Sequence, residues 1–492
     1  MQTYSNWING TFVEPSSSAW IDSVDPYRNE VWARIPASNQ TDADRAVAAA
    51  KAAMTKGPWA TMTASARGRI LSKIADVLEA NIERLAILEV RDNGKLLAEM
   101  RGQVKYSADY WRYYAGLADK IEGSVVPIEK ADTIGMTFKE PVGVVLAITA
   151  WNSPLTFFAL KCAPALAAGC AVVLKPSEFS SVSSLEFAAL TKEAGLPDGV
   201  INVVSGYGAD IGSTLVEHPD VAQITFTGSD QTGAHIYAAA ARHMKRVAME
   251  LGGKSPNIVF EDADLEAAAH GAVSGIFGAA GQMCTAGSRL LVQNSIRSEF
   301  TQKVVDLTKS IKLGDPTDPA TQMGPISNAA QHRKVLDYIG IAKAEGAVCT
   351  LGGVAPESTL SNGLFISPTI FTGVTNDMRI AQEEVFGPVL SVIGFEDEAE
   401  AIQIGNDIAF GLAAGVWTKD IGRMMRMTKD LNVGTVWGNT YRSYSYTLPF
   451  GGRKRSGIGR ENGIESINEF LETKSLMLSV RTVNRKPNFV PD

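Results

Sequence analysis

The sequence predicts an α/β protein built around mainly parallel β-sheets that are buried on both faces. Short runs rich in β-branched residues alternate along the chain with amphipathic stretches of helical periodicity, a pattern typical of strand–helix units. The chain has 492 residues, more than one hydrophobic core usually supports, so we expect two large lobes. No fixed-period repeat or low-complexity block interrupts the pattern.

The hydrophobic periodicity places the main elements. Strands are expected over 142–149, 171–174, 222–227, 247–251, 257–260 and 389–393. Helices are expected over 43–54, 64–91, 185–194, 265–280, 298–311 and 328–345.

Two segments break this rhythm. Residues 123–140 are polar and strand-like, and residues 472–480 alternate in polarity before an extended polar tail. Such strands can extend the edge of a sheet, within one chain or across subunits. A surface hairpin with a frayed tail explains the same pattern equally well.

Composition excludes several classes of protein. The 46 basic and 53 acidic residues give a formal net charge of -7, which argues against a general nucleic-acid surface. The four cysteines are scattered and form no metal-ligand cluster, so we expect a reducing, cytoplasmic setting and no bound metal. The N-terminus has no signal-peptide pattern, and the most apolar stretch, ALKCAPALAAGCAVVL, is too short to cross a membrane.

Cys284 is a candidate nucleophile. It lies in GQMCTAGSR, between a helix-forming run and a strand, and its small neighbours leave room for a substrate beside the sulfur. A thiolate attacks carbonyl carbons readily when its pKa is lowered or a base is near. A buried structural role is the more common fate of a single free cysteine.

Glu250 is a candidate general base. In MELGGKSP it ends a strand just before two glycines, and a partly desolvated carboxylate there can take a proton from water. A surface ion pair is the ordinary alternative for a lone glutamate. The five histidines all lie outside the glycine-rich segments, which favours Glu250 over a Cys–His pair.

Two further strands end in polar residues. In AITAWNSPL, the amide of Asn152 can donate to a developing oxyanion, although an asparagine can also simply close the turn. In VVLKPSE, Lys175 and Glu178 follow a strand whose carboxyl end is a nucleotide-binding position in parallel sheets. Because a carboxylate accepts both ribose hydroxyls and repels a 2′-phosphate, Glu178 favours NAD over NADP.

Four glycine-rich or acidic segments give weaker signals. SGYGADIG and FTGSDQTG each follow a strand and can present a helix N-terminus to an anion, but neither has the GxGxxG spacing, and packing turns explain such glycines more often. EEVFGP offers a carboxylate and an aromatic ring before a strand. PFGGRKRSGIGRE is a basic closing loop, either anion-binding or simply solvated.

Taken together, these segments resemble the aldehyde dehydrogenase superfamily. The motifs occur in the family's order from Trp151 to Glu461, so the resemblance covers essentially the whole chain. It implies that Cys284 is the nucleophile, that Glu250 activates the hydrolytic water, and that Asn152 and the Cys284 N–H hold the oxyanion. It implies supporting positions at Lys161, Lys454 and Glu461, for which we favour structural roles.

The resemblance also implies a cofactor cleft for NAD, with NADP the less favoured alternative. The expected cofactor residues are Ile148, Trp151, Lys175, Ser177, Glu178, Gly208, Gly212, Phe226, Gly228, Ser229, Leu251, Glu384 and Phe386. It further implies an NAD-binding domain of residues 1–122 and 141–251, a catalytic domain of 252–453, and a small β oligomerisation element of 123–140 and 472–492. A homodimer or homotetramer is expected.

The implied reaction oxidises an aldehyde through a thiohemiacetal and a thioester on Cys284, which water then releases as the carboxylic acid. The chain departs from many relatives at Ala150, where proline is common, and at Ser153, where an aromatic residue is common. The change at Ser153 is expected to widen the substrate tunnel. The nature of the aldehyde is left open by the sequence.

The substrate tunnel is expected to include Ser153, Phe157, Leu160, Met283, Thr285, Arg442, Tyr444 and Phe450. We hypothesise that Arg442 pairs with a carboxylate or other polar end of the substrate; a surface or subunit-interface ion pair is the competing explanation.

Two rival functions are weighed against aldehyde oxidation. Transfer of the acyl group to coenzyme A is disfavoured because that branch of the family lacks the water-activating glutamate, and Glu250 is present. A non-catalytic protein on the same scaffold is disfavoured because Cys284, Glu250 and Asn152 are all intact.

Overall fold

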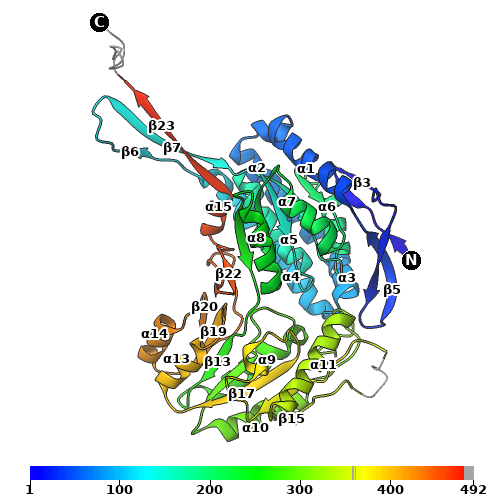
Figure 1. The fold of residues 1–492 in the computed structure, drawn as a ribbon, viewed down its shortest axis with the longest axis vertical. Helices are drawn as coiled ribbons and strands as arrows, with labels where there is room; N and C mark the ends of the chain where they lie inside the picture. The colour runs from blue at the N-terminus through cyan, green and yellow to red at the C-terminus, as the bar shows by residue number, and fades with distance from the viewer. Residues whose placement is uncertain (357–359, 361, 481–492) are drawn as a thin grey trace.

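The computed structural model describes residues 1–356, 360 and 362–480, which form two α/β lobes and a projecting β-arm (Figure 1). Each lobe is built around one large sheet, and the chain crosses between lobes more than once. The C-terminal strand runs along the arm, away from both lobes. The prediction of an α/β protein with two lobes is therefore confirmed.

The first lobe contains an eight-stranded sheet in the order β22-β12-β11-β8-β9-β10-β2-β3. Its five central strands, β12 to β10 in that order, are parallel, and the strands at both edges are antiparallel. A separate three-stranded sheet has the order β1-β5-β4. The strands are β1 (Gln2–Thr3), β2 (Asn6–Ile8), β3 (Thr11–Val13), β4 (Trp20–Asp25), β5 (Glu30–Pro36), β8 (Val144–Ile148), β9 (Ala171–Lys175), β10 (Ile201–Val203), β11 (Val221–Thr227), β12 (Arg246–Glu250) and β22 (Gly457–Ile458).

Helices pack on both faces of this sheet. Along β8, Val145 and Ala147 belong to one buried hydrophobic cluster, whereas Val144 and Leu146 belong to another. Alternate side chains of the strand thus enter cores on opposite faces, as expected for a parallel sheet covered on both sides. The helices are α1 (Gln40–Thr55), α2 (Ala64–Ala80), α3 (Ile82–Asn93), α4 (Leu97–Leu117), α5 (Pro154–Ala168), α6 (Val182–Leu190), α7 (Ser213–Glu217), α8 (Asp230–Ala241) and α15 (Glu465–Glu469).

The second lobe contains a seven-stranded sheet in the order β15-β16-β17-β14-β13-β19-β20, parallel except for β15 at one edge. A single hydrophobic cluster joins its strands to the surrounding helices. The strands are β13 (Pro256–Val259), β14 (Arg289–Gln293), β15 (Val348–Leu351), β16 (Thr369–Thr372), β17 (Val389–Phe395), β18 (Phe410–Gly411), β19 (Ala413–Trp417), β20 (Thr435–Gly438) and β21 (Arg453–Lys454), of which β18 and β21 pair separately. The helices are α9 (Leu265–Phe277), α10 (Arg297–Lys309), α11 (Ala329–Ala344), α12 (Arg379–Gln382), α13 (Glu398–Asn406) and α14 (Ile421–Asp430).

The arm is a three-stranded antiparallel sheet in the order β23-β7-β6. Its strands are β6 (Val125–Val126), β7 (Thr133–Pro141) and β23 (Leu471–Ser479), and β7 and β23 pair over nine residue positions. Both segments that broke the helical rhythm are therefore strands of one sheet. The tail after residue 480 lies outside the described residues.

Three expected boundaries were wrong or incomplete. The single helix expected over 64–91 is two helices, because Asn81 leaves the helical conformation and its side-chain amide donates to the Val77 carbonyl at 2.8 Å. The helix expected to run to 280 ends at Phe277, because Ala279 and Ala280 have positive φ. Residues 454–471, which no expected domain included, supply β22 to the first sheet.

Candidate active site

The carboxyl ends of three neighbouring strands bring distant residues together. In β8, Ile148 lies opposite Phe226 of β11 on one side and Lys175 of β9 on the other. In β11, Thr227 lies opposite Glu250 at the end of β12. The residues that follow these strands therefore meet at one edge of the sheet, where nucleotides bind in open α/β sheets.

A cleft opens at this edge, between the two lobes. It brings together ten of the residues expected from sequence, from segments as far apart as β8 and the loop before β17. Expected residues in its lining are Trp151, Asn152, Phe157, Gly228, Ser229, Glu250, Leu251, Cys284, Glu384 and Phe386, and the lining also includes Ala150, Thr227, Gly252, Gln331 and Lys334.

Cys284 enters this cleft from the loop between α9 and β14. Burial raises the pKa of its thiol to about 12, and the carboxylates of Glu384 and Glu250 add to the increase. The backbone around it is tightly confined, because a β-carbon on Gly253 would come within 2.4 Å of the Cys284 carbonyl oxygen. The thiol is thus held in a restrictive, negatively charged setting, in which thiolate formation needs help.

Glu250 is buried at the carboxyl end of β12. Its Oε1 atom has no hydrogen-bond partner among the described residues, which is costly for a buried polar atom. Burial raises the pKa of Glu250 well above its usual value, and the nearby carboxylate of Glu461 raises it further. An unpartnered carboxylate with a raised pKa has the properties of a general base.

Asn152 faces the same loop. Its buried side-chain amide donates to the Gln282 carbonyl at 3.0 Å, which ties the end of β8 to the residues just before Cys284. A side-chain amide has two N–H donors, so the second one is left for a ligand. Gln282 was not singled out from sequence, although its own side chain anchors the loop through Ser327 N–H at 2.8 Å.

Lys161 and Glu461 form a buried ion pair behind Glu250. Lys161 Nζ lies 2.8 Å from Glu461 Oε1 and 3.1 Å from Thr225 Oγ1. Lys454 is elsewhere, where its ammonium group donates to the carbonyls of Asn406 and Ile408. Lys161 and Glu461 therefore contribute to the electrostatics around Glu250, whereas Lys454 cross-links loops of the second lobe.

One end of the cofactor region lies beyond β9. Lys175 is almost fully buried and its Nζ lies 3.3 Å from Glu178 Oε2. Burial lowers the pKa of Lys175, an effect that Glu178 opposes. Ser177, between them, is also buried. A cation and a carboxylate fixed side by side at a strand end match the donors and acceptors of a ribose.

The next part is the N-terminus of α8. Ser229 caps this helix through a hydrogen bond from Thr232 N–H at 3.2 Å. A β-carbon on Gly228 would collide with the Phe226 ring at 2.4 Å, and one on Gly233 would meet Leu251 at 2.5 Å. The turn thus requires glycine for packing, and it leaves backbone N–H groups and a helix dipole facing the cleft.

The other end of the cleft comes from the second lobe. Glu384 Oε1 accepts from Gly253 N–H at 3.0 Å, and burial raises its pKa to about 7. Phe386 has a positive φ and packs edge-on against Trp151, with ring centroids 5.2 Å apart. Gln331 holds this loop by donating to the carbonyls of Val385 and Phe386.

Several residues depart from the expected arrangement or were missed. Gly208 and Gly212 lie in a π-helical turn and are not among the residues that line the cleft. Gln331 and Lys334 do line it, but they come from α11, whose amphipathic pattern carries no signal for a binding role. Ile148 and Phe226 are buried beneath the cleft in the strands.

Of the expected substrate residues, only Phe157 is among those that line the cleft, and Tyr444 and Arg442 contact the loop of Cys284. The hydroxyls of Tyr444 and Thr285 are hydrogen-bonded to each other, and Tyr444 packs against Phe450 with ring centroids 6.1 Å apart. Arg442 Nη1 lies 3.0 Å from the sulfur of Met283, next to the nucleophile. Ser153 is buried, and Phe157 and Leu160 follow it on α5.

The residues present fit a nicotinamide dinucleotide. A cation–carboxylate pair at one end, a helix N-terminus in the middle and a buried carboxylate at the other end match the two riboses and the pyrophosphate. The Oγ1 atoms of Thr149 and Thr227, which have no hydrogen-bond partner in the part of the chain that the structure describes, lie along the same strand ends. The fold and the cleft define a dinucleotide-dependent oxidoreductase with a cysteine beside the cofactor site.

Comparison with known proteins identifies the family. Residues 12–476 match the model of the aldehyde dehydrogenase family. A (Z)-2-((N-methylformamido)methylene)-5-hydroxybutyrolactone dehydrogenase of Acinetobacter baylyi is 45% identical over 97% of both chains. A betaine aldehyde dehydrogenase of Brucella anthropi is 44% identical over 98% of both chains.

Solved structures agree with this assignment. A crystal structure of betaine aldehyde dehydrogenase from Staphylococcus aureus in complex with NAD+ superimposes with a TM-score of 0.97 at 42% identity, over 99% of this chain and 97% of that one. The chain belongs to the aldehyde dehydrogenase family. It is an oxidoreductase that oxidises an aldehyde to the carboxylic acid with NAD as the cofactor.

Proposed function

We propose that the chain is a hydrolytic aldehyde dehydrogenase in which Cys284 is the nucleophile, Glu250 the general base for water and Asn152 the oxyanion donor. The unpartnered carboxylate of Glu250, buried in the same cleft as the thiol, carries this proposal. Acyl transfer to coenzyme A needs no base for water. A carboxylate kept buried without a partner is costly, so its retention favours hydrolysis.

The reaction follows from these positions. Cys284 loses its thiol proton, which passes to Glu250 and from there to solvent, as its sulfur adds to the aldehyde carbon, and the free N–H of Asn152 stabilises the oxyanion together with the Cys284 N–H. When bound, NAD supplies the hydride acceptor. The product on Cys284 is then a thioester, and Glu250 takes a proton from a water molecule whose oxygen attacks the acyl carbon. The acid leaves and the thiol is restored.

The cofactor would be held across both lobes. Lys175, Ser177 and Glu178 would bind the adenosine ribose, and the Gly228–Ser229 turn the pyrophosphate. Glu384 would bind the nicotinamide ribose, with Phe386 and Trp151 packed beside it. In this arrangement residues 1–122 and 141–251 form the NAD-binding domain and 252–453 the catalytic domain.

Replacement of the nucleophile tests this proposal. Cys284→Ser is expected to lower kcat by on the order of 10⁴-fold or more, as removal of a covalent nucleophile does elsewhere. Cys349→Ser is the matched control, because that half-buried thiol lies on the edge strand β15 and does not line the cleft. Acyl-CoA formation from an aldehyde, NAD and coenzyme A would contradict hydrolysis, as would full activity in Cys284→Ser.

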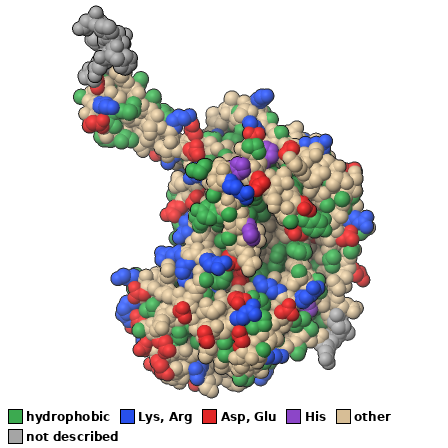
Figure 2. Space-filling view, in the orientation of Figure 1, with side chains coloured by type: hydrophobic (Ala, Val, Ile, Leu, Met, Phe, Trp, Pro, Cys, Tyr) green, Lys and Arg blue, Asp and Glu red, His purple; other side chains and the backbone are tan. Residues whose placement is uncertain are grey.

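We propose that the arm of β6, β7 and β23 is an oligomerisation element. β23 is the edge of its sheet, and the arm exposes Val125, Phe138, Met477 and Leu478. Figure 2 displays hydrophobic side chains on this projecting arm. An unpaired edge with exposed apolar side chains can be completed by a second copy. A homodimer or homotetramer in the cytoplasm is the expected form.

Sedimentation of the intact enzyme tests this assembly. The wild-type chain is expected to sediment as a dimer or tetramer, and Phe138→Lys with Met477→Lys is expected to shift it towards monomer. Lys139→Met, on the same strand, is the control. A wild-type enzyme that sediments as a monomer at micromolar concentration would contradict the proposal.

A further inference from the structure

Lys95 is a buried cation beside the substrate side of the active site. It follows α3, is only 2% exposed, and its Nζ donates to Ser153 Oγ at 3.0 Å. Ser153 is the residue directly after Asn152. No carboxylate of the described residues lies within 4.0 Å of this ammonium group. A buried charge without a counter-ion is costly, so its retention calls for an explanation.

Arg442 brings a second cation to the same place. It belongs to the loop after β20, where it adopts a positive φ, and its guanidinium lies against the sulfur of Met283. In the described part of the chain Arg442 also lacks a carboxylate within ion-pair distance. The surface ion pair weighed from sequence is therefore not formed within the described part of this chain.

Two acids, Glu99 and Glu89, lie near Lys95 but outside ion-pair distance, and they offset only part of the charge of the two cations. Glu99 has the larger influence on Lys95; its Oε1 accepts from Ala279 N–H at 3.0 Å, and its Oε2 has no hydrogen-bond partner among the described residues. Glu89 accepts from Leu155 N–H, and burial raises its pKa to about 7, so it is only partly ionised at neutral pH. Burial lowers the pKa of Lys95 to about 8, which still leaves the ammonium group mostly protonated at pH 7.

Lys95 and Arg442 lie close to the proposed catalytic residues, because Lys95 contacts Ser153 and Arg442 contacts Met283. Ser153 follows the proposed oxyanion donor, and Met283 precedes the proposed nucleophile. The electrostatic influence of Cys284 and of Arg442 on Lys95 also places all three groups near one another. Lys95 and Ser153 are both buried, whereas Arg442 beside them is only partly buried, so Arg442 is the cation that a ligand reaches first and Lys95 adds its charge from behind.

We propose that the aldehyde substrate carries a carboxylate at the end remote from the carbonyl, and that Lys95 and Arg442 bind this carboxylate with Ser153 orienting the ammonium group. The proposal rests on the reaction proposed for Cys284 and names the substrate class. Arginine binds carboxylates through paired N–H donors, and lysine supplies a point charge. A quaternary ammonium substrate would be repelled at the same place.

The wild-type enzyme provides the first test. Rates of NADH formation would be measured for succinic and glutaric semialdehydes against butanal and pentanal, and for betaine aldehyde against its neutral isostere 3,3-dimethylbutanal. The expected kcat/KM is at least tenfold higher for one acidic aldehyde than for its neutral partner, and lower for betaine aldehyde than for its isostere. Glyceraldehyde 3-phosphate tests whether the site binds a phosphate instead. A kcat/KM higher for this aldehyde than for both semialdehydes would overturn the carboxylate assignment.

Variants then show which residues determine the preference for acidic over neutral aldehydes. The ratio of kcat/KM for the acidic and the neutral aldehyde is formed within each variant, so a general loss of activity cancels. Arg442→Met and Lys95→Met are each expected to lower this ratio tenfold or more, and Arg442→Lys to restore most of it. Arg426→Met, which removes an exposed cation of the second lobe outside the site, is the control and should leave the ratio within twofold of the wild type.

The outcomes separate the substrate class from the reaction itself. Equal kcat/KM for acidic and neutral aldehydes in the wild-type enzyme, or a ratio unchanged in both Met variants, would refute the proposal while leaving the chemistry of Cys284 intact. If Lys95→Met does not fold, Arg442→Met and Arg442→Lys decide. If no aldehyde of either charge is oxidised, the proposed function itself fails.

Discussion

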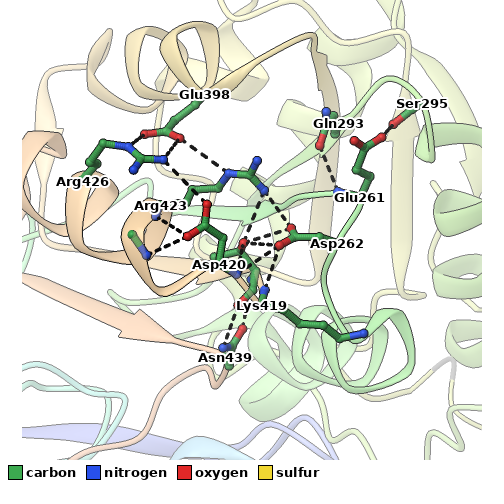
Figure 3. A network of polar contacts seen from close by, with 12 residues as sticks. Glu261, Asp262, Gln293, Ser295, Glu398, Lys419, Asp420, Arg423, Arg426 and Asn439 are labelled. Carbon is green, nitrogen blue, oxygen red and sulfur yellow. Dashed lines mark hydrogen bonds and ion pairs between the residues drawn. The ribbon is translucent and has the colours of Figure 1, made fainter.

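Charged residues in the second lobe and charged residues at the cleft differ in how completely they are paired. Arg423 pairs with Asp262 at 2.8 Å and lies near Glu398 (Figure 3). It also stacks over the Phe260 ring. Asp262 also accepts from Thr418 and from two backbone N–H groups. Near the cleft, by contrast, Lys95 and Arg442 have no acid of the described residues within ion-pair distance, and Glu250 has an unpartnered oxygen.

The difference separates groups that serve the fold from groups that serve a ligand. Where no ligand binds, the chain supplies both members of each charged pair, and the network stabilises the lobe. At the cleft some charges are paired, as in Lys175–Glu178, but Glu250 and Lys95 are left incomplete at a cost to stability, which a bound substrate or cofactor can offset. Removing a charged side chain at the cleft should therefore impair activity without loss of stability. Removing a charged side chain of the Asp262–Arg423–Glu398 network should lower stability and leave activity unchanged.

The largest expected effect is at Glu250. Glu250→Gln should lower kcat by on the order of 10²–10⁴-fold, the usual contribution of a general base, while a thioester on Cys284 accumulates. Rapid-mixing measurements should reveal a burst of NADH, and mass spectrometry of the quenched protein should detect the acyl adduct. A kcat within threefold of the wild type would remove Glu250 from the chemistry.

The same variant has a pH signature in stability. Burial and Glu461 raise the folded-state pKa of Glu250 above its usual value, although Lys161 and Arg460 oppose this. The folded state then binds more protons than the unfolded state, so stability from this group falls as pH rises above about 4.5. Glu250→Gln should gain stability over the wild type progressively from pH 5 to pH 8 in urea denaturation. A constant difference would contradict the raised pKa.

A smaller effect is expected within the network. Asp262→Ala leaves Arg423 partly buried without its main acceptor, and it removes the acceptor of two N–H groups before α14. We expect a loss of about 2 kcal/mol in the free energy of unfolding, since hydrogen bonds to charged groups contribute about 1.5–3 kcal/mol. The kcat/KM of the folded variant should match the wild type. An Asp262→Ala variant that keeps its stability but has a lower kcat/KM would contradict a purely structural role for this network.

The smallest effect is expected at Arg426. Its ion pair with Glu398 is bidentate, with contacts of 2.7 and 2.8 Å, but the side chain is largely exposed to water. Exposed pairs contribute little, because water and salt screen them. Arg426→Met should lower the melting temperature less than Asp262→Ala does and leave selectivity unchanged. An equal or greater shift would mean that the network acts as one unit.

The sequence predicted the parts of the candidate site that lie where an apolar strand or helix ends. Cys284, Glu250 and Asn152 each sit where a buried apolar run gives way to a polar or glycine-rich turn, and such junctions are visible without a structure. The parallel sheets and the six expected strands, which correspond to β8, β9, β11, β12, β13 and β17, follow from the same periodicity, whereas β1 to β5, β10, β15, β16, β19 and β20 were not expected. The strand character of 123–140 and 472–480 was visible in the sequence, but the pairing of these two segments with each other was not.

Other parts depend on tertiary contacts that the sequence does not display. Gln331 lies on an ordinary amphipathic helix, and only its donation to Phe386 reveals its role. Lys95 follows a helix in a segment rich in charged residues, where a solvated lysine is the ordinary expectation, yet it is buried against Ser153. The helix is interrupted at Asn81 because the Asn81 side-chain amide donates to the Val77 carbonyl, and the two flanking helix-forming runs give no sign of this hydrogen bond in the sequence.

The short strand β22 has a consequence for how the chain is made. Met249 and Glu250 pair with Ile458 and Gly457, more than 200 residues later in the sequence. During synthesis the strand that carries Glu250 is therefore an open sheet edge until almost the whole chain has left the ribosome. Open edges recruit other strands, and contacts between distant residues form slowly. The nascent chain is therefore exposed to aggregation at the strand that carries the proposed general base.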